Sequence, residues 1–416
     1  MTKESRMQGH GSLTYLDGIR GIAAFCVFLH HFGLAFYTAY YSLDPHAVHL
    51  PNALEIRYGQ SLLSVLTNGN FCVCIFFVLS GFVLSQKYFN TQEPKELVSG
   101  AQRRFLRLYI PVAFTLIVSF VLLVAHLYYN KPASVIAHSE WWFGPYVSFP
   151  GCFGQFRDCL LYKTMLFGDN TFDTSMWTIA VELYGSLMVF AYLALTHGTR
   201  NRVAALIIML LYCYLTNSTF MADFLLGISL NYTRKNSHKQ NKYVVMFGAP
   251  MLFLFSLFLG AYPTTDNRAG SVFEHMGHSL YDYTGWFHII GGYLLILSFT
   301  LSIRMQKLIS MRMFRFLGYI SFSLYLLHPL VMGSIGSYAF LKMYKGLGYN
   351  HAVVVVFGIC TIVLIAASWL MARYIDNPGT KFARYVYDRF FKAKPALSAA
   401  GAGALDDAPP NDKLAA

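Results

Sequence analysis

Residues 16–32, LDGIRGIAAFCVFLHHF, decide the fold, because this long apolar run places two ionisable side chains on one helical face. Arg20 and His31 are eleven residues apart, almost three full helical turns, so both point in the same direction. At a rise of about 1.5 Å per residue they lie ~16 Å apart along the axis. If Arg20 marks the inner edge of a membrane, His31 lies near the middle of a hydrocarbon layer ~30 Å thick. An ionisable group at that depth is expensive, so His31 is either functional or satisfied by a neighbouring helix.

The composition indicates a membrane protein. The chain has 416 residues, of which 56% are apolar and 12% are charged, and this charged share is about half that of soluble domains. The first residues are polar and the first apolar run is long enough to remain as a span, so we expect no cleavable signal peptide. We predict an all-α fold, a polytopic membrane helix bundle of about ten transmembrane helices. The predicted spans are residues 19–40, 61–85, 108–129, 177–196, 203–217, 219–232, 243–261, 286–303, 316–340 and 351–373.

The basic residues predict the orientation of this bundle. With the N-terminus in the cytoplasm, 25 of the 32 Lys and Arg residues fall in inner segments and 7 in outer ones, as the positive-inside rule requires. Both termini are therefore expected in the cytoplasm, and the net charge of +12 is a topology signal that requires no nucleic-acid partner. We expect a cytoplasmic segment at residues 1–14, one membrane domain at 15–392, and a disordered tail at 393–416.

The seven cysteines have no spacing typical of a metal site, and we predict no metal. Cys152 and Cys159 share a predicted outer loop. They could form a disulfide in an oxidising lumen or remain free thiols.

A second set of polar residues lies in the ninth predicted span, within the segment FLGYISFSLYLLHP at 316–329. Ser321, Tyr325 and His328 are spaced i, i+4 and i+7, on one helical stripe. From an inner edge near residue 316, His328 lies ~18 Å deep, close to the depth of His31. The two histidines are therefore expected to share a polar cavity, or else to bond separately to carbonyls that Pro329 leaves free.

Two further segments carry charge into the bundle. Glu182 in SMWTIAVELYGS (175–186) lies ~8 Å below the outer edge of the fourth span. It could orient a histidine, pair with an arginine, bind a substrate hydroxyl, or only hydrogen-bond between helices. Arg104 and Arg107 in QRRFLRLYIP (102–111) share a face at the inner mouth of the third span. They could bind phosphate oxygens, or act as an ordinary anchor beside anionic headgroups.

Five segments together resemble a known family. LDGIRGIAAFCVFLHH (16–31), FVLSGFVLS (77–85), RRFLRLYIP (103–111), WTIAVELYGS (177–186) and GYISFSLYLLHP (318–329) occur in this order. The chain is similar, from Tyr15 to Arg384, to the acyltransferase-3 family of integral-membrane acyltransferases, which modify sugars, glycolipids and small metabolites. The overall style resembles fungal members. Phe322 and Gly185 depart from residues common in the family, which affects the expected acceptor pocket more than the catalytic core.

The resemblance implies roles for particular residues. It makes His31, Glu182 and His328 the catalytic candidates. The candidates for binding acyl-CoA are Arg20, Arg104 and Arg107, and those for binding substrate are Trp177, Ser323 and Tyr325.

The implied reaction is O-acyl transfer from acyl-CoA, with acetyl-CoA favoured, to a hydroxyl group of a small metabolite, sugar or glycolipid. An alcohol needs a general base, for which His31 is the candidate, although a covalent acyl group on His31 is an alternative. Acyl-CoA would be a co-substrate, with no permanently bound cofactor. The expected surroundings are the lipid bilayer of a eukaryotic endomembrane or plasma membrane. A proton-coupled transporter or a lipid-binding scaffold are the other function classes that buried ionisable groups allow.

Overall fold

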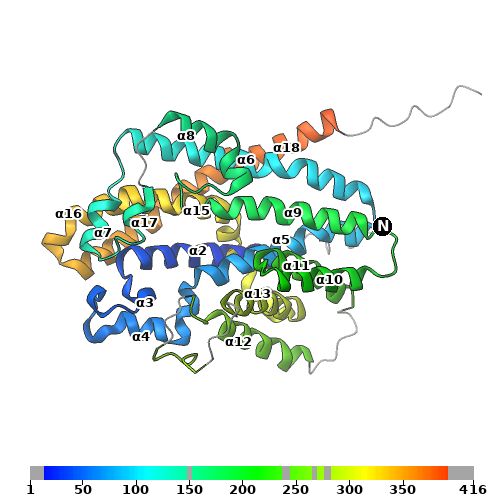
Figure 1. Ribbon diagram of the computed structural model, residues 1–416, viewed down its shortest axis with the longest axis horizontal. Helices are drawn as coiled ribbons and strands as arrows, with labels where there is room; N and C mark the ends of the chain where they lie inside the picture. The colour runs from blue at the N-terminus through cyan, green and yellow to red at the C-terminus, as the bar shows by residue number, and fades with distance from the viewer. Residues whose placement is uncertain (1–13, 148–151, 237–243, 265–268, 276–282, 392–416) are drawn as a thin grey trace, which may run out of the picture.

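The computed structural model describes residues 14–147, 152–236, 244–264, 269–275 and 283–391. The described residues form an all-helical bundle in which α2 lies at the centre and most long helices run along the longest axis of the molecule (Figure 1). The long helices are α2 (Thr14–Phe36), α5 (Gly69–Thr91), α6 (Pro94–Val124), α9 (Trp177–Leu195), α11 (Thr219–Asn236), α13 (Tyr283–Leu301), α15 (Arg312–Val331) and α17 (Tyr349–Met371).

Shorter helices connect and extend these. On the main bundle they are α10 (Arg202–Leu215), η7 (Val244–Gly248), α12 (Ala249–Gly260), α14 (Ile303–Ile309), η8 (Met332–Gly336), α16 (Ser337–Leu347), η9 (Ala372–Asp376) and α18 (Asn377–Phe390). The connections after α2 and α6 contain α3 (Ala39–Ser42), η1 (Pro45–Ala47), η2 (Pro51–Ala53), α4 (Leu54–Gln60), η3 (Leu62–Thr67), α7 (Asn130–Ile136), η4 (Gly144–Val147), α8 (Phe153–Asp158) and η5 (Cys159–Phe167).

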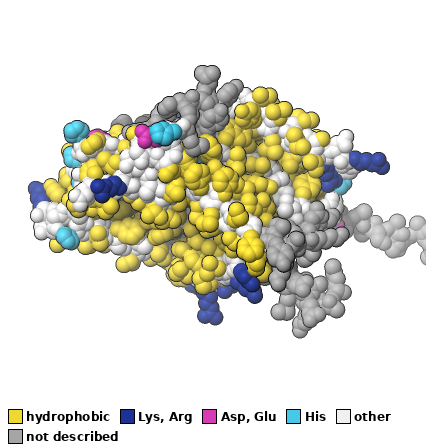
Figure 2. Space-filling model, turned by 90° about the horizontal axis from the view of Figure 1, so that it is seen from below, with side chains coloured by type: hydrophobic (Ala, Val, Ile, Leu, Met, Phe, Trp, Pro, Cys, Tyr) yellow, Lys and Arg dark blue, Asp and Glu magenta, His cyan; other side chains and the backbone are white. Residues whose placement is uncertain are grey.

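Six helices of the described residues are long and apolar enough to cross a membrane, or seven if the bent pair of α13 and α14 counts as one span. Hydrophobic side chains cover much of the face in Figure 2, with Lys and Arg toward its edges. The structure therefore supports a helical membrane protein. It does not confirm a count of ten, because α10 has only 14 residues and α12 only 12, too short for ~30 Å of hydrocarbon.

Two predicted boundaries were wrong. The second span was predicted to begin at residue 61, but α5 begins at Gly69, where the Asn68 side chain accepts a hydrogen bond from the Phe71 N–H at 3.0 Å. Residues 62–67 form the separate helix η3, which the Ser61 side chain caps. The third helix runs over 94–124 instead of 108–129, so its arginines lie well inside a helix. The Ser61 and Asn68 caps set the starts of η3 and α5, which averaged hydropathy does not detect, whereas α6 begins at Pro94 without a side-chain cap.

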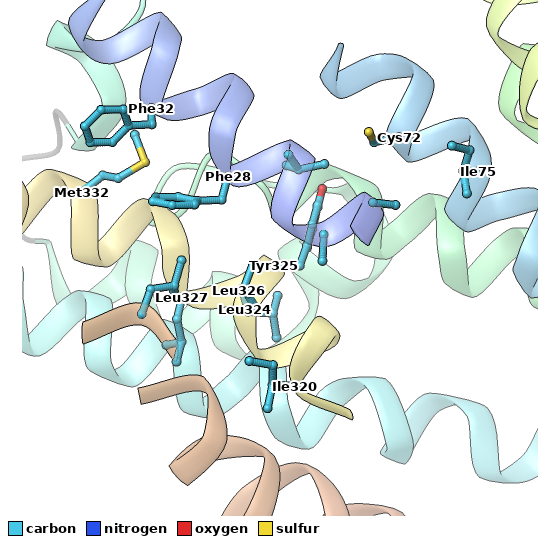
Figure 3. Close-up of a cluster of buried hydrophobic side chains, with 14 of the residues drawn as sticks. Phe28, Phe32, Cys72, Ile75, Ile320, Leu324, Tyr325, Leu326, Leu327 and Met332 are labelled. Atoms are coloured by element: carbon cyan, nitrogen blue, oxygen red, sulfur yellow. The ribbon is translucent and has the colours of Figure 1, made fainter. Parts of the chain in front are cut away.

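Glycines bring the N-terminal and late helices into backbone contact. A Cβ on Gly21 of α2 would meet the backbone nitrogen of Gly318 on α15, and a Cβ on Gly18 would meet the carbonyl of Ile309. Further along α2, toward its C-terminal end, Phe28 and Phe32 lie beside apolar side chains of α15 and η8 (Figure 3). This close packing brings together two segments that are about 300 residues apart in the sequence.

A glycine also brings α5 and α11 close together, since a Cβ on Gly81 would meet the carbonyl of Phe224 on α11. The possible disulfide of the outer loop can be compared with the structure as well. Cys152 is exposed and Cys159 is buried, and both are free thiols, so the possible disulfide is absent. Residues 1–13 and the tail at 393–416 lie outside the described residues.

Candidate active site

The two predicted histidines meet at the crossing of α2 and α15. His31 Nδ1 lies 2.6 Å from His328 Nε2, and the two rings stack with centroids 4.8 Å apart. His328 is fully buried, whereas His31 is half-buried. The sequence left open two separately satisfied histidines, and the structure shows a hydrogen-bonded pair instead.

The backbone around Pro329 favours one assignment of the protons of this pair. Pro329 has no N–H, so the carbonyl of Tyr325 on the preceding turn lacks its helical donor. The carbonyls of Leu324 and Tyr325 lie within reach of the His328 ring, whose Nδ1 makes no hydrogen bond to the described residues. A proton on His328 Nδ1 leaves its Nε2 to accept from His31 Nδ1–H. In this arrangement His31 Nε2 is left with its lone pair.

Trp142 covers the His31 ring and was not among the predicted site residues. Its ring centroid lies 5.1 Å from that of His31, with the planes tilted by 37°. Trp142 comes from the connection between α6 and α9, where side chains follow no helical period. The sequence places Trp142 in an aromatic stretch at 131–176 that could stack against an acceptor or lie at the membrane interface, but it gives no position relative to His31.

Glu182 pairs with an arginine, one of the four roles that the sequence left open. Its carboxylate bonds to the Arg104 guanidinium and accepts a hydrogen bond from Ser80 Oγ at 2.8 Å. Arg104 Nε also donates to Ser186 Oγ at 2.8 Å, one turn further along α9. The ion pair joins α6 to α9. Because Arg104 is buried, its charge needs this partner, and the pair neutralises both side chains.

A cavity of about 400 Å³ opens beside this ion pair, and we call it the arginine cavity. Tyr325 lines this cavity, and its ring centroid lies 5.9 Å from that of His328. The cavity therefore leads from cationic side chains toward the histidine pair. Its charged lining residues are Arg20, Arg104, Arg107, Arg315, Asp17, Glu182 and Asp376.

The arginines of this cavity differ in what already neutralises them. Arg104 is occupied by Glu182, and Arg20 lies 3.3 Å from the exposed Asp17 on the same helix. Arg107 and Arg315 form no ion pair with the described residues. Arg315 was absent from the predicted set, because the sequence places it among several basic residues at the inner end of the ninth span.

The predicted substrate-binding residues are not all brought together. The Tyr325 hydroxyl lies 3.0 Å from Thr178 Oγ1 and donates to the Ser175 carbonyl at 3.2 Å. Ser321 lines the arginine cavity, whereas Ser323 is fully buried and its hydroxyl has no partner among the described residues. Trp177 packs against Phe220 of α11, with ring centroids 5.3 Å apart, and does not line the arginine cavity. Substrate binding by Ser323 and Trp177 stays a prediction.

A family model described as an acyltransferase domain matches residues 13–373. The chain belongs to the acyltransferase-3 family. It is therefore a membrane acyltransferase, an enzyme that transfers acyl groups other than aminoacyl groups. Membership favours an enzyme over the transporter and the scaffold that the buried ionisable groups also allowed.

Fungal acyltransferases are among the similar proteins. The chain is 23% identical to Acyltransferase R4 of a Phoma species, over 90% of this chain and 96% of the relative. It is 21% identical to Acyltransferase clz18 of Cochliobolus lunatus, over 90% of this chain and 95% of that protein. It is 28% identical to the O-acetyltransferase PaAT-1 of Phomopsis amygdali, over 44% of this chain and 40% of that protein. No solved structure matches the chain.

Proposed function

We propose that this enzyme transfers an acetyl group from acetyl-CoA to a hydroxyl group of a small metabolite, sugar or glycolipid, with His31 as the general base. The observation that carries the proposal is the His31–His328 hydrogen bond beside a cavity rich in arginine. The printed name of one relative, an O-acetyltransferase, supports the acetyl group and the oxygen acceptor.

The donor would enter the arginine cavity. Arg107 and Arg315, together with Arg20, are the cations available there for the phosphates of CoA, because guanidinium groups bind phosphate oxygens in pairs. Arg104 would act by positioning, since Glu182 already neutralises it. The thioester would then point past Tyr325 toward the histidine pair.

The chemical step uses the lone pair on His31 Nε2. This nitrogen removes the proton of the acceptor hydroxyl as the oxygen attacks the thioester carbonyl. The carbon–sulfur bond breaks, and the thiolate of CoA takes up the proton. His328 would hold the His31 ring and stabilise its charged form by accepting from Nδ1–H. In a second route, His31 Nε2 attacks the thioester first and CoA leaves as the thiolate. The acceptor hydroxyl then attacks the acyl-imidazole and gives its proton to the thiolate, and His31 Nε2 is released.

The membrane topology is also part of the proposal. Ten spans with both termini in the cytoplasm agree with the distribution of Lys and Arg along the chain. This orientation would open the arginine cavity to the compartment that supplies acetyl-CoA. An endomembrane or the plasma membrane of a eukaryote is the proposed location.

The test measures free thiol released when membranes containing the protein receive acetyl-CoA and candidate alcohols. Release should depend on the acceptor and be lost in His31→Ala. The control is His46→Ala, which removes an exposed histidine from η1 and should leave the rate unchanged. Acceptor-dependent release that persists in His31→Ala would remove the role given to His31. Substrate flux across vesicles without CoA consumption would instead favour a transporter.

A further inference from the structure

A second cavity, of about 350 Å³, lies beside His30, near the C-terminal end of α2 and far from Arg20. We call it the polar cavity. Its volume is within the range of roughly 300–1,000 Å³ that small-molecule sites occupy. Helices α2, α3, α5, α11 and α13 contribute to its wall. The lining residues that carry side-chain polar groups or aromatic rings include His30, Tyr41, Asn70, Asn217, Thr219 and Phe220.

The lining predicts the chemistry of a ligand. Among the described lining residues, His30 is the only one with a basic or acidic side chain of the Lys, Arg, His, Asp and Glu types. The described part of the wall therefore offers no Lys or Arg to an anion and no carboxylate to a cation. Asn70 and Asn217 offer amide donors and acceptors, and Thr219 offers a hydroxyl that makes no hydrogen bond with the described residues. Such a wall suits a neutral molecule with several hydroxyl groups.

Two of these side chains are held in place by their neighbours. His30 Nδ1 lies 2.7 Å from the Thr67 carbonyl and 2.8 Å from the Tyr40 hydroxyl. Asn70 Nδ2 lies 2.8 Å from His288 Nδ1. His30 and Asn70 are thus oriented before a ligand arrives, which lowers the entropy cost of binding.

The polar cavity also lies next to the reacting pair. The His30 ring that lines it has its centroid 5.3 Å from that of His31. On the other side of the pair, Tyr325 of the arginine cavity is 5.9 Å from His328. Each histidine of the pair thus has a neighbouring ring that lines a cavity: His30 lines the polar cavity beside His31, and Tyr325 lines the arginine cavity beside His328.

We propose that the polar cavity binds the acceptor, a neutral polyhydroxylated molecule about the size of a monosaccharide, and extends one hydroxyl past His30 to His31. Asn217 and Thr219 are the residues that would determine specificity. This proposal rests on the proposed function, because it assigns the second substrate of the same reaction.

The test uses methyl β-D-glucopyranoside and 1-octanol as acceptor probes, with acetyl-CoA as donor and thiol release as the readout. Thr219→Val removes the hydroxyl at constant shape. Asn217→Gly removes the amide and suits a backbone position whose φ is 50°. The matched control is Thr216→Val, three residues away on the exposed side of the same turn.

We expect the glucoside to be the better probe. Each cavity variant should raise its KM about tenfold, the effect of one lost hydrogen bond, with the KM of acetyl-CoA unchanged. Thr216→Val should behave as the parent. The proposal is overturned if 1-octanol supports thiol release and the glucoside does not. It is also overturned if both cavity variants keep the parental KM for the glucoside. If neither alcohol gives His31-dependent thiol release, the proposed function itself fails.

Discussion

At the scale of single residues, the environment of each imidazole determines what it can do. His328 is fully buried and its ring bonds to His31, whereas His31 is half-buried beneath Trp142. A base must reach its substrate, and a residue that orients the base need not. This difference in exposure is why we assign proton transfer to His31 and orientation to His328.

Replacing His328 should impair turnover and leave donor binding intact. In His328→Ala, His31 loses the acceptor that fixes its tautomer, so kcat should fall about a hundredfold or more. The KM of acetyl-CoA should stay within a factor of three, because the arginine cavity is unchanged. Steady-state kinetics measure both constants. An increased KM with an unchanged kcat would assign His328 to substrate binding instead.

Two arginines of one predicted motif should behave differently when replaced. Arg104→Gln breaks a buried ion pair and should lower stability by about 3–5 kcal/mol, because Glu182 is left without its partner. Arg107→Gln should leave stability nearly unchanged and raise the KM of acetyl-CoA. Melting temperatures in detergent, measured beside the kinetics, separate the two effects. Equal melting temperatures for both variants and the parent would contradict this division.

Part of this site could be predicted from the sequence. Helical periodicity placed Arg20 and His31 on one face of a helix. It also placed His31 and His328 at a similar depth, because the rise per residue is nearly constant. Periodicity could not choose the partner of Glu182, since that depends on how α6 and α9 pack. It also gave no position for Trp142, which lies in an irregular connection.

At the scale of elements, the crossing of α2 and α15 sets the distance between the histidines. Gly21 of α2 and Gly318 of α15 allow the two backbones to touch, and a side chain at either position would separate them. The site therefore depends on residues that carry no functional group.

Enlarging this contact should separate the histidines. Gly21→Ala places a Cβ against the backbone of Gly318, so we expect a loss of about 1–3 kcal/mol in stability together with a reduced kcat. Gly346→Ala is the matched control, because a Cβ there meets no atom within 4 Å. Thermal unfolding and thiol release on the two variants provide the comparison. Full activity of Gly21→Ala would show that the crossing tolerates separation.

The sequence predicted the helices better than their ends. Apolar runs place a helix in each predicted span, because burial in a bundle or in lipid selects the same composition. The ends depend on single side chains, such as the Asn68 cap that starts α5 eight residues later than expected. Whether short helices such as α10 cross a bilayer depends on their tilt and neighbours, which local composition does not contain.

At the scale of the whole molecule, two cavities at different positions along α2 differ in the charge of their lining residues. The cations gather around the arginine cavity, while the polar cavity has neutral side chains apart from His30. This arrangement gives each proposed substrate its own compartment beside the histidine pair.

The stability of the whole fold should depend on pH through Asp173. This residue lies outside the apolar helices, in the connection before α9, and is fully buried. Its Oδ1 accepts from the N–H and the hydroxyl of Ser175 at 2.8 and 2.7 Å. Burial raises its pKa from 3.8 to about 7, against the opposing effect of these hydrogen bonds.

The sign of the effect follows from proton linkage. The folded state holds the Asp173 proton more tightly than the unfolded state, so this contribution is complete below pH about 4 and is lost as pH rises to about 7. Asp173→Asn keeps the acceptor oxygen and cannot ionise. Its melting temperature in detergent should exceed that of the parent at pH 8 by more than at pH 5. Parallel curves for the two proteins would rule out this contribution.

The central claim, that His31 and His328 act as one catalytic unit, is tested most directly by a double-mutant cycle on kcat for thiol release from acetyl-CoA. We predict that the double variant His31→Ala/His328→Ala is no more than about threefold slower than His31→Ala alone, since the first change already removes what the second supports. Rate losses that multiply would contradict the account, because each histidine would then contribute independently of the other.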